Sequence, residues 1–225
     1  MKHRNKCSTH RITLFALPFG ILALAVMSVV AAPAEPNRSA IPFEQLGAAA
    51  SKRYTGDGLS ITQGAEGVSM RCVFQKMQGR VTSQGLWLTS TAEPSKRSPF
   101  RVVAQSVGRE HSVPTPLASV GEVQSHLQTV RFHRVGLDEE YAVSVDGVRQ
   151  DFVVLERPAG AGELAVRLAV SGVKVESAGA AAQLVLEHSG RRIAYSRLRA
   201  TDATGKELAA RIEVLKSNSE SRKQK

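Results

Sequence analysis

The chain has 225 residues, of which 42% are hydrophobic and 22% charged, with a formal net charge of +10. These are the proportions of a globular protein, so they exclude a chain that is disordered throughout. The charge does not indicate nucleic-acid binding. Four of the 30 Lys and Arg residues lie in the first eleven residues and four more in the last ten, which contain no aromatic residue to stack on bases.

The first 34 residues have the pattern of an export signal. Residues 1–11 carry four basic side chains, and Ile12–Val30 carries no charge. Small residues follow at Ala32-Pro33-Ala34. We therefore predict a helical signal peptide over residues 1–34, cut after Ala34 because a cut after Ala32 would leave Pro33 beside the scissile bond.

An uncleaved anchor is the alternative to this signal peptide. Residues 12–32 form an apolar run about as long as the roughly 20 residues that cross a bilayer. The chain would then be membrane-anchored with its basic end inside. No cysteine lies at the end of the apolar run, which argues against a lipoprotein.

Residues 35–51 are predicted to form a linker and one short helix. Glu35–Ala40 is polar and contains Pro36, and the helix is expected to begin near Pro42. Four residues share the helical spacing: Phe43, Leu46, Ala50 and Tyr54.

Residues 52–215 are predicted to form an all-β domain, an antiparallel β-sandwich. Short segments with a period of two follow one another, separated by turn residues. The clearest is Glu163–Ser171, which alternates apolar and polar positions and so has one wet face. The expected strands are Leu59–Gln63, Val68–Gln75, Gly85–Thr89, Phe100–Val107, Val130–Val135, Tyr141–Val145, Gln150–Leu155, Glu163–Ser171, Val173–Ser177, Gln183–His188, Ile193–Tyr195 and Ala209–Leu215.

Turns and loops are expected between these strands. Asp146-Gly147 is a hairpin signal, and Asp202–Gly205 indicates a second tight turn. Ala92–Pro99 and Glu110–Glu122 are rich in Pro, Ser and charge, so we expect surface loops there. Residues 216–225 are predicted to be a basic disordered tail.

The chain contains two cysteines, and only one would remain after export. Cys7 lies in the predicted signal peptide, so cleavage leaves Cys72 without a disulfide partner in the chain. Cys72 alternates with Val68, Met70 and Phe74. We therefore expect a buried small hydrophobe at this position and not a reactive thiol.

No group of residues has the spacing of an active or metal site. The four histidines beyond the signal peptide form no i, i+2 or i, i+4 pair, and we interpret His133 and His188 as surface residues. Asp138-Glu139-Glu140 could hold calcium weakly, but a solvated turn is the better interpretation. We assign no catalytic, cofactor-binding or metal-ligating residue and predict that the protein is not an enzyme. The four histidines are His111, His126, His133 and His188.

An ordered series of motifs over residues 52–214 resembles the N-terminal β-sandwich-like domain of large secreted bacterial proteins that carry FG-GAP or similar propeller-type repeats. The motif residues are Arg53–Leu59 (RYTGDGL), Thr129–Val135, Glu140-Tyr141, Asp146–Phe152 (DGVRQDF), Pro158–Gly172 (PAGAGELAVRLAVSG) and Tyr195–Arg211 (YSRLRATDATGKELAAR). The last two are the more specific. Tyr141 and Val148 depart from the usual pattern, and no repeats follow residue 214.

The resemblance implies an accessory or spacer β-sandwich at the cell surface or in the periplasm, and it transfers no catalytic residue. We therefore expect an exported, non-enzymatic module with a structural or interaction role, whose partner would be a cell-surface protein. The alternative is a module that uses Glu110–Glu122 or the basic tail to bind an acidic glycan or an anionic membrane surface. An uncharacterised enzyme is a third, weaker hypothesis.

Overall fold

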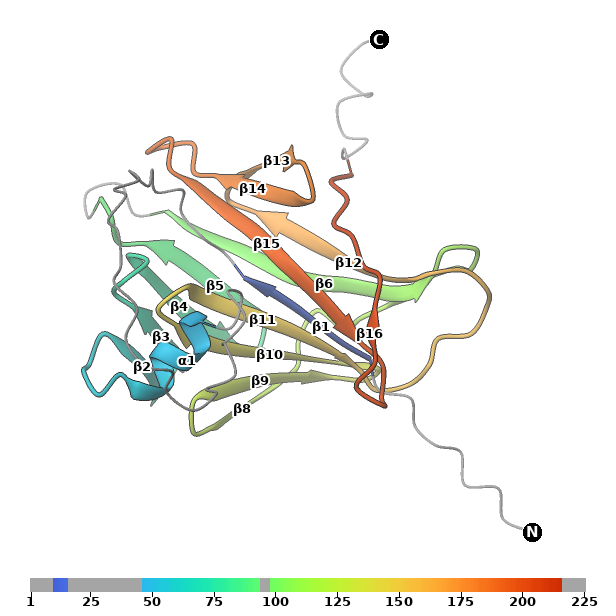
Figure 1. The fold of residues 1–225 in the computed structure, drawn as a ribbon, viewed down its shortest axis with the longest axis horizontal. Coiled ribbons are helices and arrows are strands. Elements are labelled where there is room, and N and C mark those ends of the chain that lie inside the picture. Colours follow the sequence, from blue (N-terminus) through green and yellow to red (C-terminus); the bar gives the residue numbers. More distant parts are fainter. Residues whose placement is uncertain (1–9, 16–45, 94–97, 216–225) are drawn as a thin grey trace, which may run out of the picture.

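The protein is described by a computed structural model over residues 10–15, 46–93 and 98–215 (Figure 1). Strands dominate these residues, and one short helix lies among them. The elements are β1 (His10–Phe15), α1 (Leu46–Arg53), β2 (Leu59–Gly64), β3 (Gly67–Cys72), β4 (Met77–Thr82), β5 (Gly85–Ser90), β6 (Pro99–Arg109), β7 (Thr115–Pro116), β8 (Glu122–His126), β9 (Thr129–Arg134), β10 (Leu137–Ser144), β11 (Gly147–Val154), β12 (Leu164–Ser171), β13 (Lys174–Ala178), β14 (Ala181–Val185), β15 (Arg192–Thr201) and β16 (Glu207–Leu208).

The strands form two antiparallel sheets. The larger sheet has the order β13-β14-β15-β1-β11-β10-β9-β8, with β16 beside β15. The smaller sheet has the order β12-β6-β5-β4-β3-β2, with β7 beside β6. β10 contacts β2 and β3, and β11 contacts β4, so the sheets pack face to face as a sandwich.

Alternating side chains from both sheets fill the space between them. Along β3 and β4 every second residue is buried, and Gly79 occupies one inward position where an added Cβ would meet Leu86 and Leu88. The largest buried apolar side chains come from both sheets: Tyr141, Phe100, Phe132, Phe152, Met70, Leu86 and Leu137. The antiparallel β-sandwich predicted from the sequence is therefore confirmed.

Most predicted strands are present, with shifted ends. The hairpin at Asp146-Gly147 joins β10 to β11, and the Asp202–Gly205 turn is closed by a hydrogen bond from the Gly205 amide to the Asp202 carbonyl. The strand predicted over Ala209–Leu215 is wrong, because this segment pairs with no strand in the described residues and only Glu207–Leu208 pairs with β15. Strands β4 and β8 were not predicted, since β4 contains Gly79 and β8 is a mostly exposed edge strand.

The N-terminal region differs from the predicted signal helix at the residues that can be compared. His10–Phe15 is a strand, β1, inserted between β11 and β15. A strand forms there because the two neighbouring strands offer backbone groups on both sides. The rest of the predicted signal peptide lies outside the described residues, as do residues 35–45 and the predicted basic tail, residues 216–225.

The predicted short helix is α1, which begins at Leu46 and ends at Arg53. It lies against the β10–β11 turn, where the Ser51 hydroxyl accepts a hydrogen bond from the Val145 amide at 3.0 Å. Within residues 10–15, 46–93 and 98–215, no helix has the length and hydrophobicity needed to cross a membrane.

Candidate functional site

The most unusual chemistry in the described residues lies inside the sandwich, at Glu139. The sequence interpretation of Asp138-Glu139-Glu140 as a solvated turn is wrong, because the three acids belong to β10. Strand alternation places Glu139 on the inward face with Leu137 and Tyr141, and its side chain is 0% exposed. A carboxylate in this position must be held by protein donors.

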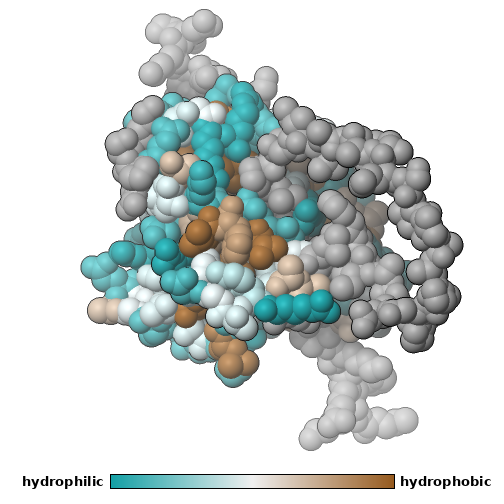
Figure 2. All heavy atoms as spheres, turned by 60° about the vertical axis from the view of Figure 1, so that its left-hand side comes forward, coloured by the Kyte–Doolittle hydropathy of each residue, from teal (hydrophilic) through white to brown (hydrophobic). Residues whose placement is uncertain are grey.

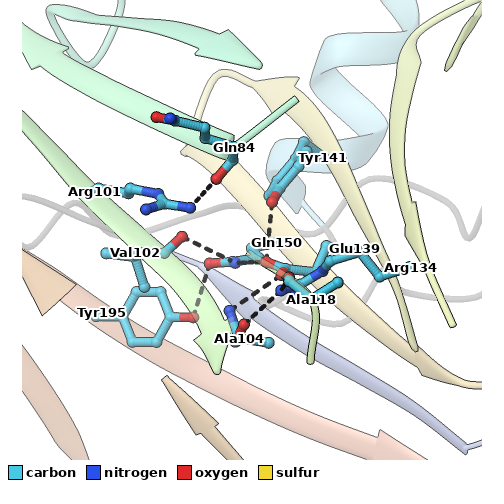
Figure 3. A network of polar contacts seen from close by, with 10 residues as sticks. All are labelled: Gln84, Arg101, Val102, Ala104, Ala118, Arg134, Glu139, Tyr141, Gln150 and Tyr195. Atoms are coloured by element: carbon cyan, nitrogen blue, oxygen red, sulfur yellow. Dashed lines mark hydrogen bonds and ion pairs between the residues drawn. The ribbon is translucent and has the colours of Figure 1, made fainter. Parts of the chain in front are cut away.

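Four donors surround the Glu139 carboxylate (Figure 3). Oε1 accepts hydrogen bonds from the Ala104 amide of β6, at 3.0 Å, and from Nη2 of Arg134. Oε2 accepts from the Tyr141 hydroxyl at 2.9 Å and from Nε2 of Gln150 at 2.6 Å. These contacts satisfy both oxygens and tie β10 to β9, to β11 and to the opposite sheet.

Arg134 is the counter-ion of this carboxylate and is buried with it. Its Nη1 donates to the carbonyls of Ala104, at 2.8 Å, and Ala118, at 3.1 Å. The guanidinium carbon lies 4.7 Å from the centre of the Phe132 ring. Nε is buried and has no hydrogen-bond partner in the described part of the chain.

Gln150 and Tyr195 extend the cluster across the larger sheet. The Tyr195 hydroxyl of β15 donates to Oε1 of Gln150 on β11 at 3.0 Å. Strand β1 separates these two strands in the sheet, so the side-chain contact spans the width of β1 (Figure 3). The polar cluster formed by Arg134, Glu139, Tyr141, Gln150 and Tyr195 therefore joins both sheets and both halves of the larger one.

Burial dominates the acid–base properties of the polar cluster. It raises the pKa of Glu139, while Arg134 and the other donors oppose that rise because they favour the carboxylate. Burial also lowers the pKa of Arg134, and Glu139 opposes that shift. The pKa values of Tyr141 and Tyr195 are raised by burial and by the nearby Glu139 charge. Both tyrosines thus remain neutral donors.

The polar cluster is closed to molecules larger than water. A neighbouring cavity, bordered by Gln150 and Tyr195, measures about 30 Å³ and has a mainly apolar lining. That volume holds about one water molecule. Because neither Glu139 nor Arg134 reaches the surface, the cluster is suited to holding the sandwich together and not to acting on a substrate.

A sequence signal for the polar cluster exists in the strand alternation. Leu137, Glu139, Tyr141 and Val143 share one parity, and so do Val130, Phe132 and Arg134. A charged residue in the apolar row of each of two adjacent strands predicts a buried ion pair. The pattern was missed because three consecutive acids suggest a turn.

The prediction for Cys72 is confirmed, with one exception in the row around it. Cys72, Val68 and Met70 are buried, but Phe74 follows the end of β3 and is 47% exposed against the Tyr54 ring. The thiol donates to the Ser144 carbonyl at 3.1 Å, and burial raises its pKa. Cys72 is therefore a core residue whose thiolate is disfavoured.

Two of the four histidines, His133 and His188, contact polar side chains. Nδ1 of His133 lies 2.5 Å from the Asp138 carboxylate on the outer face of the larger sheet, and His188 lies beside Ser98. In the described residues, no three His, Cys, Asp or Glu side chains gather in a way that could hold a metal ion.

Arg191 holds the β3–β4 connection in place. Its guanidinium donates to the carbonyls of Gln75, at 2.6 Å, and Lys76, at 2.9 Å, and to the Ser90 hydroxyl at 2.6 Å. An open hollow of about 440 Å³ lies beside it. Since its donors are used on the protein's own backbone, Arg191 is a structural clamp.

The outer surface is mostly hydrophilic. Figure 2 shows one face, on which small groups of hydrophobic side chains are separated by polar ones. The large hydrophobic residues that are most exposed are Val113, Leu127, Val135 and Leu215.

A comparison with models of known protein families, a search of curated proteins and a search of solved structures found no match to this chain. The resemblance to the secreted bacterial domains therefore rests on the quoted motifs alone.

Proposed function

We propose that the chain is an exported, non-enzymatic β-sandwich module with a structural or interaction role at the cell surface or in the periplasm. The observation that carries the proposal is the N-terminal pattern of four basic residues, an uncharged apolar run and Ala32-Pro33-Ala34. The non-enzymatic role is supported by the polar cluster, whose buried carboxylate is occupied by four protein donors.

N-terminal sequencing of the protein recovered from an exporting bacterial host tests this proposal. The expected mature chain begins at Glu35 and is found in the periplasm or medium. Recovery of an intact Met1 in the membrane fraction would instead establish the anchor formed by residues 12–32.

The salt dependence of adhesion distinguishes the binding alternative from a structural role. Adhesion of the purified protein to anionic vesicles or an acidic polysaccharide is measured between low and physiological salt. A structural or protein-interaction role gives weak or salt-insensitive adhesion, whereas binding through the basic tail falls steeply as salt rises.

A screen against ester, phosphate and glycoside substrates tests the enzyme hypothesis, which would require a turnover abolished by a single His or Asp substitution.

A further inference from the structure

In the larger sheet, β1 lies between β11 and β15, which do not pair with each other. We call the place that β1 occupies the gap. β1 runs antiparallel to β11, from His10 opposite Val154 to Phe15 opposite Arg149. It also runs antiparallel to β15, with Ile12 opposite Ala200. Without β1 the flanking strands would lie about 9.6 Å apart, twice the usual strand spacing, which is too far for backbone hydrogen bonds.

Side chains hold the two walls of this gap in place without the help of β1. The Tyr195 hydroxyl of β15 bonds to Gln150 of β11, and Gln150 is bonded in turn to Glu139. Two residues further along β15, Arg197 Nη1 lies 3.0 Å from Asp146 Oδ2, in the turn that leads into β11. Both contacts flank Ser196, which lies opposite Phe15, so side chains hold the two walls together at the Phe15 end of the gap.

Export would empty this gap. Cleavage after Ala34 removes His10–Phe15 together with the rest of the leader. The facing N–H and C=O groups of β11 and β15 would then lack partners over the length of β1. Unless an extended segment pairs with these groups, the larger sheet has two open edges.

Sequence argues against the mature chain's own ends as the replacement strand. Residues 35–45 contain Pro36 and Pro42, which cannot donate hydrogen bonds in the middle of a sheet. Residues 216–225 contain no hydrophobic residue. Neither segment therefore has the alternating apolar sequence of an inserted strand, which favours a segment of a partner protein.

We propose that the mature protein is a strand acceptor, in which the gap between β11 and β15 takes up an extended segment of a partner protein. The inference rests on the proposed export and cleavage. The segment runs antiparallel to both walls, and it alternates apolar and polar residues. One apolar position lies between Phe152 and Ala200, which are both buried, and the next position, which is polar, lies opposite Arg199, which is half exposed.

The test uses a fluorescent peptide of residues Ser8–Leu17 as the probe and the exported, N-terminally sequenced protein as the acceptor. We expect saturable binding and a higher melting temperature. The matched control is the same peptide N-methylated at Ile12 and Thr13, which keeps every side chain but removes one donor towards each wall. It should bind at least roughly tenfold more weakly, since two hydrogen bonds are lost.

A second experiment tests the inference if the mature chain unfolds when the gap is empty. A protease site is placed after Ala34 in the full chain, which is purified intact and then cut. We expect the 1–34 fragment to stay bound and the labelled peptide to displace it.

The outcomes separate this inference from the proposed function. The strand acceptor would be overturned by two results together. The folded chain that begins at Glu35 does not bind the peptide, and the cut chain loses its 1–34 fragment and does not rebind it. Both results would leave the proposed export intact. An intact Met1 would refute cleavage, and with it the empty gap. Equal binding of the methylated peptide would also overturn the inference, because pairing with the walls would not be involved.

Discussion

The Arg134–Glu139 pair shows how a single strand position can set the character of a protein interior. Two hydrophobic clusters meet there: Tyr141 and Val148 belong to one, and Leu137 and Phe152 to the other. Glu139 lies between Leu137 and Tyr141 on β10. Burying two charges costs several kcal/mol per ion, which their attraction offsets only when the remaining hydrogen bonds are satisfied. The polar cluster meets that condition for the carboxylate.

Removing one partner of this pair should destabilise the fold more than removing both. Arg134→Met leaves the Glu139 charge buried, and Glu139→Leu leaves the Arg134 charge buried, so each should lower the free energy of unfolding by about 3 kcal/mol or more. The double variant should lose less than either single variant, because it leaves no charge buried without its partner. Urea unfolding of the four proteins measures the difference. Arg80→Met, which breaks an exposed pair with Glu66, is the control and should leave the midpoint nearly unchanged. Additive losses would show that the two charges are not coupled.

The raised pKa of Glu139 predicts the direction in which the stability of the fold changes with pH. Burial raises this pKa in the folded state above its unfolded value, which is about 4.3. A raised folded pKa contributes stability that is complete below the unfolded pKa and is lost as the pH rises through the folded pKa. The stability advantage of the native protein over Glu139→Gln should therefore shrink as the pH rises from 4 to 8. Urea midpoints of both proteins across that range measure it. An advantage that grows with pH would mean that the four donors outweigh burial.

At the scale of elements, the β8–β9 hairpin contains an avoidable strain. His126 pairs with Thr129, and the loop residue Leu127 has φ +51° and is 83% exposed. A left-handed backbone costs a non-glycine residue about 1 kcal/mol, and Asn is favoured at this position of a two-residue loop. Leu127→Asn should therefore raise the free energy of unfolding by roughly 0.5–1 kcal/mol. Val135→Asn is the control, since Val135 is 91% exposed in the next hairpin loop but is not among the residues with positive φ. An equal gain in both variants would point to lost surface hydrophobicity as the cause.

The side-chain contact between β11 and β15 can be tested by removing the Tyr195 hydroxyl. Tyr195→Phe removes the hydroxyl that donates to Gln150 and leaves a buried amide oxygen without that donor. The expected loss is about 1–2 kcal/mol. Thermal unfolding measures it, with Arg192→Ala on the same strand as the control, because Arg192 is exposed and bonds to Glu176 and Gln183. An unchanged melting temperature for Tyr195→Phe would show that this contact does not hold the two strands together.

The sequence predicts the elements whose alternation is regular, and fails where another requirement interrupts it. Val68, Met70 and Cys72 repeat every second residue, so β3 and its buried cysteine follow directly. Gly79 stands at an inward position of β4 because Leu86 and Leu88 leave no space for a Cβ, and this hides the strand. In β10, Glu139 breaks the apolar row because Arg134 and Gln150 of the adjacent strands β9 and β11, and the Ala104 amide of β6, donate hydrogen bonds to it. The alternation marks Glu139 and Arg134 as inward-facing, but the Ala104 amide lies 35 residues away in the sequence, so no local pattern shows that it completes the site.

At the scale of the whole molecule, the larger sheet consists of two halves joined by β1. One half contains β8, β9, β10 and β11, and the other contains β13, β14, β15 and β16 (Figure 1). In the described residues, no backbone pairing connects the halves except through β1, and Tyr195 and Arg197 add the side-chain contacts. The smaller sheet is continuous from β2 to β12. The two sheets should therefore respond differently when β1 is weakened.

Hydrogen exchange of the full chain can detect this difference. Thr13→Pro removes a backbone donor in the middle of β1, where Thr13 lies between Asp151 and Arg199. Because β1 provides the backbone hydrogen bonds that link the two halves among the described strands, amides of β11 and β15 should exchange faster, while those of β3, β4 and β5 keep their protection. Ala203→Pro is the matched control: it places proline at the second position of the Asp202–Gly205 turn, which accepts it, and should leave both sheets unchanged. A uniform rise across both sheets would instead show that the sandwich opens as one unit, and no change at all would show that β1 does not stabilise its neighbours.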